Sequence, residues 1–381
     1  MPRTPASTLL LVGLLASSLA CNLGRSVDKA TLKTLAPGML ADDDVGMACA
    51  AGGSLAPVTI ALGHRSGGAK EPKKAAALTL IAAGMCSERA AWESELERAL
   101  AMYRVEHGDP KEGAALQDLL IRERRSRAEA AARNLKAYER VVAAYGAPTD
   151  EALCPRRLPE RDQLLCLLGM TAGLLAVIHD TAADRAVGVS QAIPRHVQRG
   201  VGCVDDERWW GLPGSLKAAI GASIPGAGEP GVDPWTELER AARQGEAKGV
   251  WLGRALQVHT AAAAGKDEVV RMAIAAHGQA IRGGEGEPAV ALLNTYASSM
   301  IQQRSDLLWI AAAGHRTPIG ALGELPQTIS DDEADALLEG LEDEAPPPAA
   351  TSPAPAGEPS PTDAPASGGQ GPAASTQKPQ G

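Results

Sequence analysis

The sequence predicts an all-α protein of stacked helical hairpins, the arrangement known as an α-solenoid. Apolar residues recur at helical spacing in segments of about 15 to 20 residues, which are separated by turns rich in Gly and Pro. No segment shows the features of a strand. The chain has no Phe and is rich in Ala, Leu and Gly. Its core must therefore be built from small side chains, which suits closely packed helices.

The first segment, residues 1–20, has the features of a secretory signal peptide. A basic start at Arg3 precedes an apolar stretch of about a dozen residues, and small residues lead up to Cys21. This stretch is too short to cross a bilayer, which takes about 20 apolar residues. Leu19-Ala20-Cys21 looks like a bacterial lipobox, so we expect a lipid on Cys21. The alternatives are an ordinary cleaved signal peptide and a retained anchor.

The expected location is the periplasm, with the protein attached to the membrane through Cys21. Asn22, rather than Asp, follows the cysteine and favours the outer membrane by analogy with sorting rules. A lipidated tether at residues 21–41, with a short helical piece near residues 27–35, comes next. A helical domain at 42–329 and a tail at 330–381 follow. The segment 331–381 holds ten acidic residues and one Lys, and it thus carries a charge of -9. Its end is rich in Pro and Ala with few large apolar residues, which predicts disorder. The remaining body is close to neutral, which argues against a nucleic-acid partner.

The helices of the N-terminal half are expected in order. Asp42 to Asp44 precede an apolar helix over 45–62, with a kink near Ala56. Residues 71–107 form two helices, or one with a break near Ser87. The longest helical signal covers 111–145. Its basic centre, Arg122–Arg127, is interpreted as a solvated face because acidic residues are interspersed, although a patch for phosphate or an acidic partner is the alternative.

The C-terminal half begins with a helix that is apolar almost all round, over 161–179, which predicts a central buried position. A helix over 181–197 and an irregular segment over 200–231 follow. The further expected helices cover 233–243, 248–264, 266–282 and 287–313. No strict 34-residue repeat is visible, so tetratricopeptide-like geometry is only suggested.

The cysteines point to disulfides because an exported chain enters an oxidising compartment. The six are Cys21, Cys49, Cys86, Cys154, Cys166 and Cys203. The favoured pair is Cys49 with Cys86, since each lies on one of two successive helical segments. A second pair among Cys154, Cys166 and Cys203 is left unassigned, and buried unpaired thiols are the alternative. Their spacing matches no zinc signature.

No motif carries recognisable catalysis, so we expect neither an enzyme nor a bound cofactor or metal. The seven His show no metal-ligand spacing, and no nucleophile elbow is present. Gly226, Gly228 and Gly231 match GxGxxG, but no strand precedes them and Pro230 interrupts the pattern.

Three aromatic residues are candidate contacts for a ligand or partner. Trp209 and Trp210 lie in the irregular segment, and Tyr296 lies on the last helix. Core packing is the favoured interpretation of each, because without Phe the Trp residues must fill the large core spaces.

Several segments together resemble the TRAP transporter TatT component family of periplasmic helical lipoproteins. They are the Cys21 lipobox, the aspartates before a small-residue helix, the basic, Ala-rich Arg127–Tyr145, Asp233-Pro234-Trp235 leading to LERAARQ, and LLNTYASSMIQQRSDLLW at Leu292–Trp309. The resemblance covers roughly residues 40 to 312. The absence of Phe, the extra Cys and the long tail depart from the pattern.

The resemblance implies a tetratricopeptide-like homo-oligomer, a trimer, with a lumen in each protomer. It also implies an accessory role beside a periplasmic substrate-binding protein and a permease that move an organic ligand. The leading hypothesis is therefore a non-enzymatic lipoprotein of a TRAP-type transport system. An envelope scaffold without a ligand is the second hypothesis, and an enzyme of unrecognised type is the third.

Overall fold

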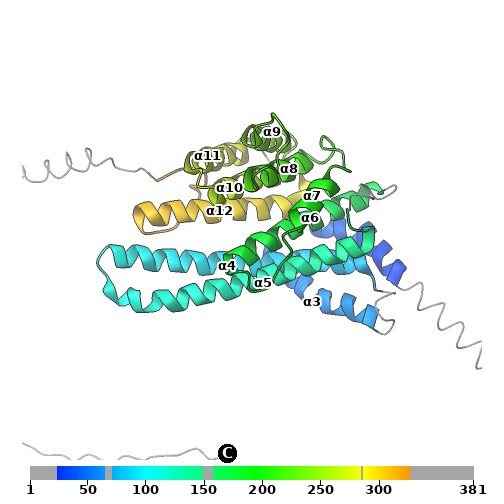
Figure 1. The fold of residues 1–381 in the computed structure, drawn as a ribbon, viewed down its shortest axis with the longest axis horizontal. Coiled ribbons are helices and arrows are strands. Elements are labelled where there is room, and N and C mark those ends of the chain that lie inside the picture. The colour runs from blue at the N-terminus through cyan, green and yellow to red at the C-terminus, as the bar shows by residue number, and fades with distance from the viewer. Residues whose placement is uncertain (1–23, 65–70, 149–157, 285, 327–381) are drawn as a thin grey trace, which may run out of the picture. The chain divides into compact units, whose positions relative to one another are not determined.

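The computed structural model describes residues 24–64, 71–148, 158–284 and 286–326, and these contain helices and loops without a strand (Figure 1). The all-α prediction is thus confirmed for these ranges. The chain divides into two units, Met1–Thr328 and Ile329–Gly381. All helices below belong to the first unit. Cys21, Cys154 and the predicted tail at 330–381 lie outside the described residues.

The segment expected to be a tether is helical and contributes to the core. Residues 24–40 are helical, with a π-helical turn η1 (Thr31–Leu35) followed by α2 (Ala36–Leu40). Leu32, Ala36 and Leu40 are buried in the main core cluster. Their spacing of four residues places them on one face of the helix. The short helical piece expected near residues 27–35 is therefore part of a longer helix, which packs on the body instead of forming a loose tether.

The N-terminal helix also caps the start of α4 (Lys73–Glu106), which has no side-chain cap of its own. Asp28 Oδ1 accepts hydrogen bonds from the backbone N–H groups of Lys74 and Ala75, each at 3.0 Å. The first N–H groups of a helix have no partner within it, so a carboxylate from elsewhere in the chain can satisfy them. The cap fixes the N-terminal helix to the long hairpin.

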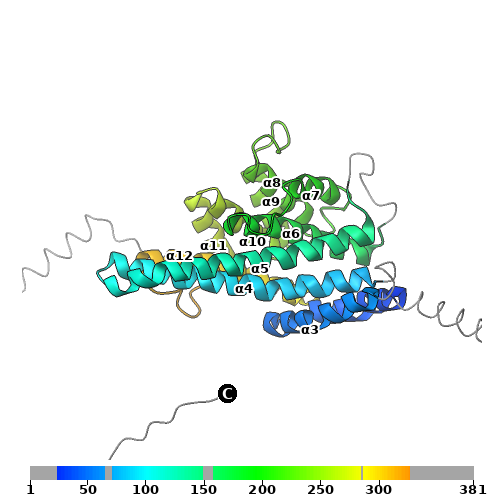
Figure 2. The same ribbon diagram turned by 60° about the horizontal axis from the view of Figure 1, so that its bottom comes forward.

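Two long antiparallel helices dominate the fold (Figures 1 and 2). They are α4, with 34 residues, and α5 (Gly113–Tyr145), with 33, joined through the short turn η2 (Pro110–Glu112). The break predicted near Ser87 is absent. Ser87 is buried inside α4 and its hydroxyl accepts a hydrogen bond from Arg133 of α5. This tertiary contact gives the Ser87 hydroxyl a partner, so the hydroxyl does not disturb the backbone hydrogen bonds of the helix.

Helix α3 (Val45–His64) packs against α4, with Pro57 inside it. Gly52 allows the two backbones to approach closely, since a Cβ there would lie 2.6 Å from the carbonyl oxygen of Thr79. Cys49 and Cys86 form a disulfide between these helices, with their Cα atoms 5.4 Å apart. Helix α3 is thereby held on α4 at two neighbouring points.

Helix α6 (Glu160–Ala182) lies centrally, as its apolar composition predicted. Gly169 and Gly173 bring it close to Val141 and Tyr138 of α5. It ends at Ala182, where the expected helix over 181–197 does not form. Instead the carboxylate of Asp180 accepts hydrogen bonds from the N–H groups of Val187 and Val189 and holds a loop. The next helix, α7 (Ile193–Val201), begins after it.

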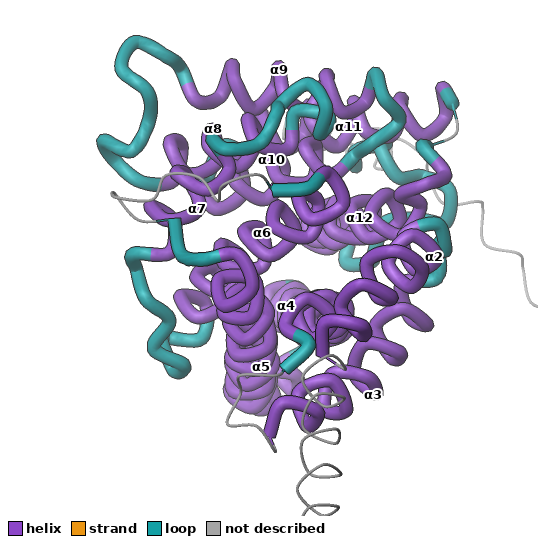
Figure 3. Tube along the Cα trace, turned by 90° about the vertical axis from the view of Figure 1, so that its right-hand side faces the viewer, coloured by secondary structure: helices purple, strands orange, loops and turns teal. Residues whose placement is uncertain are grey.

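Five further helices complete the described body around α10 (Figure 3). They are α8 (Leu212–Ser223), α9 (Pro234–Glu246), α10 (Leu252–Ala263), α11 (Asp267–Gly283) and α12 (Ala291–Ala313), with a turn η3 (Pro288–Val290) before the last. Helix α10 contacts the other four. Helix α8 falls within the segment expected to be irregular. Pro213 lies in its first turn, where a missing N–H is harmless, so the proline does not prevent the helix.

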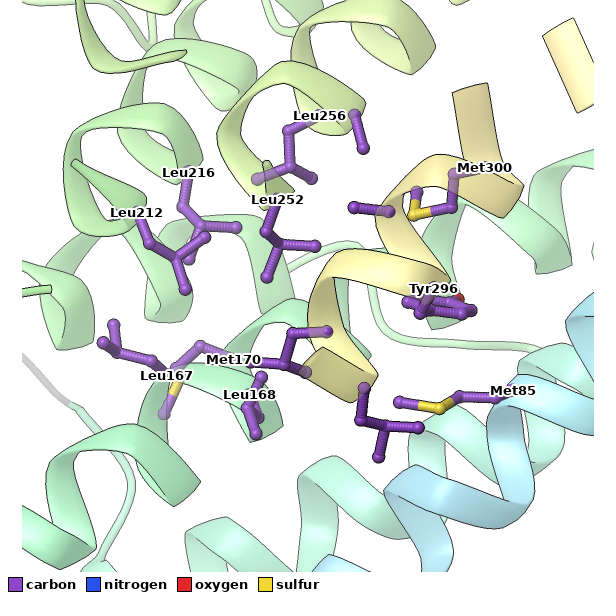
Figure 4. Close-up of a cluster of buried hydrophobic side chains, with 14 of the residues drawn as sticks. Met85, Leu167, Leu168, Met170, Leu212, Leu216, Leu252, Leu256, Tyr296 and Met300 are labelled. Carbon is purple, nitrogen blue, oxygen red and sulfur yellow. The ribbon is translucent and has the colours of Figure 1, made fainter. Parts of the chain in front are cut away.

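A single main core joins the long helices to the C-terminal group (Figure 4). Leu167 and Met170 of α6 meet leucines of α8 and α10, while Met300 of α12 lies nearby. The hydrophobic face of α6 is thus shared between both parts of the body, which explains its nearly continuous apolar sequence.

Candidate functional site

An open pocket of about 520 Å³ lies between the N-terminal helix and α6. Its lining is mostly apolar. The lining residues are Leu32, Ala36, Pro37, Leu40, Leu78, Pro159, Glu160, Arg161, Leu164, Leu165, Leu168 and Trp209. Pockets for small organic molecules typically measure about 300 to 1,000 Å³ and combine apolar walls with a few polar groups. This pocket has those properties.

The pocket walls come from three parts of the chain that lie far apart in sequence. The buried face of the N-terminal helix forms one wall, leucines of α6 form another, and Leu78 of α4 contributes between them. Trp209, from the turn before α8, closes one side. Its indole Nε1 donates a hydrogen bond to Gln163 Oε1 at 2.8 Å, which fixes the ring beside α6. The walls are therefore preformed.

Two charged residues of the first turn of α6 also line the pocket. Glu160 is paired with Arg208. Arg161 is exposed and forms no ion pair with any described residue. A guanidinium at this place can pair with an acidic group on a molecule whose apolar part fills the pocket.

The structure separates the three aromatic candidates. Trp209 lines the pocket. Trp210 is half-buried and packs edge-to-face against Trp209, with the two ring centroids 5.4 Å apart. Tyr296 is buried on α12 and stacks on Trp92 of α4 at 5.8 Å. It borders a separate cavity of about 30 Å³, which has room for one water molecule. Trp210 and Tyr296 are therefore absent from the lining of the larger pocket.

A buried cluster of charged and polar side chains is a second notable feature. Arg127 of α5 donates to Glu95 Oε2 at 2.5 Å and to His179 Nδ1 at 3.2 Å. Glu95 also accepts from Gln303 Nε2 at 2.6 Å, and its other oxygen lies 3.6 Å from Arg304 Nη1. These contacts join α4, α5, α6 and α12.

This cluster corrects the interpretation of Arg122–Arg127 as a solvated face. Arg122 and Arg124 are exposed, but only 7% of the Arg127 side chain is accessible. The position of Arg127 around the helix indicates that its side chain points inward. Arg127 lies three and four residues before Ala130 and Ala131, which are both fully buried, and so belongs to the inward face of α5.

The cluster resembles a structural junction more than a catalytic centre. Glu95 and Glu123 are matched by arginines, as in the 2.5 Å pair between Arg98 and Glu123, whereas the buried Glu88 accepts from Asn134 and lies 3.7 Å from His179. The burial of His259, together with the nearby positive charge of Arg304, lowers its pKa. Among the described residues, no group of His, Cys, Asp or Glu has the arrangement of a metal site.

The cysteines offer no reactive thiol in the described ranges. Cys203, like Cys49 and Cys86, is disulfide-bonded, and Cys166 is the free cysteine there. Burial, with a contribution from the negative charge of Asp162, raises the pKa of Cys166 to about 12. The thiolate form that attacks electrophiles is therefore scarce at neutral pH.

Stability should decrease in mild acid through His277 of α11. Burial, and then the positive charge of Arg254, lower the pKa of His277 from 6.5 to about 4. The unfolded chain takes up this proton near pH 6.5 while the folded protein does not. The stabilisation is thus complete above pH 6.5. It is lost progressively as the pH falls from about 6.5 through about 4. We expect a loss of about 2 kcal/mol by pH 5.

Chemical unfolding at neutral pH and at about pH 5 measures this loss. The His277→Gln variant should lose about 2 kcal/mol less stability between the two conditions than the parent protein. His315→Gln, at an exposed position, is the matched control and should behave like the parent. Identical pH dependence of the parent and His277→Gln would contradict the prediction.

Comparison with known protein families, with curated proteins and with solved structures found no match to this chain.

Proposed function

We propose that this chain is a non-enzymatic, lipid-anchored helical protein of the bacterial envelope that binds an apolar organic ligand in the pocket beside Trp209. The observation that carries the proposal is the pocket itself, with apolar walls and an arginine, Arg161, that forms no ion pair with any described residue. Its volume of about 520 Å³ suits one small amphiphile. The proposed periplasmic anchor rests on the motif at Cys21, and the preference for the outer membrane rests on Asn22 after it.

The transport role rests on the family resemblance. In this proposal the body is tetratricopeptide-like, assembles as a trimer and accompanies a periplasmic substrate-binding protein of a TRAP-type system. The ligand pocket would then receive the organic molecule that the partner carries. The described helices are compatible with stacked hairpins, while their lengths vary from 5 residues in α2 to 34 in α4.

The ligand class follows from the lining of the pocket. Leucines, Pro and Trp bind a hydrocarbon or ring system through its removal from water. Arg161 pairs with a carboxylate at the end of that molecule. A monocarboxylic acid with an apolar body, such as a medium-chain fatty acid, meets both requirements.

Fluorescence titration with dansyl-labelled undecanoic acid tests the site. The protein used begins at residue 21 and carries Cys21→Ser. Ala36→Trp fills the pocket from the N-terminal helix, so it should weaken binding at least roughly tenfold, which is about 1.4 kcal/mol. Ala30→Trp, at an exposed position of the same helix, is the matched control and should bind like the parent.

The Arg161→Gln variant separates the two parts of the recognition. It should weaken binding of the labelled acid several-fold and leave binding of a neutral apolar dye unchanged. Equal binding by Ala36→Trp and the parent, with both folded by circular dichroism, would exclude this pocket. A parent protein that binds no probe would favour an envelope scaffold without a ligand.

A further inference from the structure

Helix α3 is apolar on every side, yet most of it is not buried. Residues 45–63 contain no Asp, Glu, Lys or Arg. Among the described helices, α3 and α6 are both long and apolar enough to span a membrane. The apolar window of α6 is 67% buried and serves the core, whereas that of α3 is only 33% buried. A helix that is apolar all round normally has both faces covered.

The outer face of α3 forms a continuous apolar stripe. Its large exposed side chains are Met47 at 62%, Leu55 at 38%, Val58 at 56% and Leu62 at 41% relative exposure. At about 100° per residue these four positions lie within about 80° of one another around the helix. Ser54 is the polar side chain among them, and its hydroxyl donates to the carbonyl of Ala50. The stripe therefore has no exposed charge.

The stripe is held outward by the opposite face. Cys49 is bonded to Cys86, Gly52 lies against the backbone of α4, and Ala56 is buried. Helix α3 cannot turn its outer face inward without breaking these contacts. Large exposed apolar surfaces of this kind mark sites for a protein or a membrane.

The neighbouring N-terminal helix carries a basic stripe. Arg25, Lys29 and Lys33 follow one another at intervals of four residues and are exposed. None forms an ion pair with another described residue. Asp28 is the one acidic residue between 24 and 40, and it is occupied in capping α4. Both helices pack against α4, with residues 41–44 between them.

We propose that the outer face of α3 and the basic stripe of the N-terminal helix together form a docking surface for a bilayer that contains anionic phospholipid. Exposed cations on one helix and an uncharged apolar stripe on the next helix of the chain complement anionic headgroups above acyl chains. The surface also adjoins the end of the chain nearest to Cys21, which lies four residues before Arg25. The proposal requires neither ligand binding in the pocket nor the lipid group expected on Cys21.

The aspartates before α3 define how the helix meets the lipid. Asp42, Asp43 and Asp44 are exposed, and Asp44 Oδ1 caps the helix by accepting from the N–H of Met47 at 2.8 Å. An anionic surface repels these three charges. The C-terminal part of α3, with Val58 and Leu62, should therefore enter more deeply than its start.

Vesicle flotation tests the docking surface without the lipid anchor. The protein begins at residue 21 and carries Cys21→Ser. It should float with phosphatidylglycerol–phosphatidylethanolamine vesicles and bind pure phosphatidylcholine vesicles at least tenfold more weakly. The double variant Val58→Asp, Leu62→Asp should lower binding at least tenfold. Lys29→Glu with Lys33→Glu should also lower it and reduce its salt dependence.

Met272→Asp is the matched control. Met272 lies on α11, outside the proposed surface, and its exposure of 57% is close to the 56% of Val58. It should bind vesicles like the parent. All the changed side chains are exposed, so thermal unfolding should be unaltered and exclude misfolding as a cause. Equal vesicle binding by the Val58→Asp, Leu62→Asp variant and the parent would overturn the proposal. The proposal would also be overturned if the parent protein bound neither kind of vesicle but formed a dimer that these substitutions abolish.

Discussion

Replacing Arg127 with Met should lower the free energy of unfolding by roughly 3 kcal/mol. The substitution keeps an apolar stem of similar length but removes the guanidinium that lies 2.5 Å from Glu95. Glu95 stays largely buried and keeps the amide of Gln303 and the more distant Arg304, 3.6 Å away, but it loses its closest cation. Such a loss is costly because the protein interior screens and solvates charge poorly.

The control for this experiment is Arg124→Met, three residues earlier on the same helix. Arg124 pairs with Asp184 at 2.8 Å, but both side chains are largely exposed, at 47% and 66%. Exposed pairs contribute little, so this change should cost less than about 1 kcal/mol. Urea unfolding of the two variants gives the comparison directly. Equal losses in the two would show that the buried cluster contributes nothing beyond an ordinary surface pair.

A double variant identifies the origin of the Arg127 effect. If the cost comes from the loss of the closest cation of Glu95, Arg127→Met with Glu95→Gln should lose less stability than the sum of the two single changes. The residues are in contact, so their effects should couple by about 1 kcal/mol or more. Additive losses would assign the effect to packing of the Arg127 stem instead.

Removal of the Cys49–Cys86 disulfide should be the second large effect. The two cysteines are 37 residues apart in sequence, and a closed loop of that length restricts the unfolded chain by an amount worth about 3 to 4 kcal/mol. The Cys49→Ser, Cys86→Ser variant should therefore unfold at lower denaturant concentration. Amide exchange in α3 should also accelerate more than in α6, because α3 makes fewer buried contacts.

Cys166→Ala is the comparison for the disulfide variant. It removes a buried free thiol from α6 but leaves the covalent links intact. Its cost should be that of a small cavity, about 1 kcal/mol. A disulfide variant that unfolds at the same denaturant concentration as the parent would contradict the prediction.

Regular apolar spacing allowed much of the C-terminal half to be predicted. The helices expected at 248–264, 266–282 and 287–313 correspond to α10, α11 and α12, with boundaries shifted by a few residues. Each has a strong internal signal, namely an apolar face and a Gly or Pro near its ends. The position of α6 was also predictable, because few helices are apolar all round without being central.

Features that depend on distant partners could not be predicted in this way. The interior position of Arg127 depends on Glu95 and on the α12 residues around it, and Gln303 is separated from Glu95 by 208 residues. The helix at 24–40 forms where Leu32 and Leu40 find a core assembled from other segments. The residues next to these positions do not indicate such partners, and tertiary burial overrides the local preference for a loop or an exposed face.

The pocket was only partly predictable for the same reason. An aromatic residue in an irregular segment indicated Trp209, but the leucines opposite it come from helices that ordinary core packing already explained. Tyr296 was indistinguishable from Trp209 by sequence, and its stacking on Trp92 shows that it serves the packing between α12 and α4.

The early start of the N-terminal helix limits the reach of an anchored protein. Helical structure is present from residue 24, three residues after Cys21. Three extended residues span at most about 11 Å, whereas the 20 residues of a free tether would span about 70 Å. A protein held at Cys21 therefore explores only a thin layer next to the bilayer. A soluble periplasmic partner would have to come to the membrane surface to meet it.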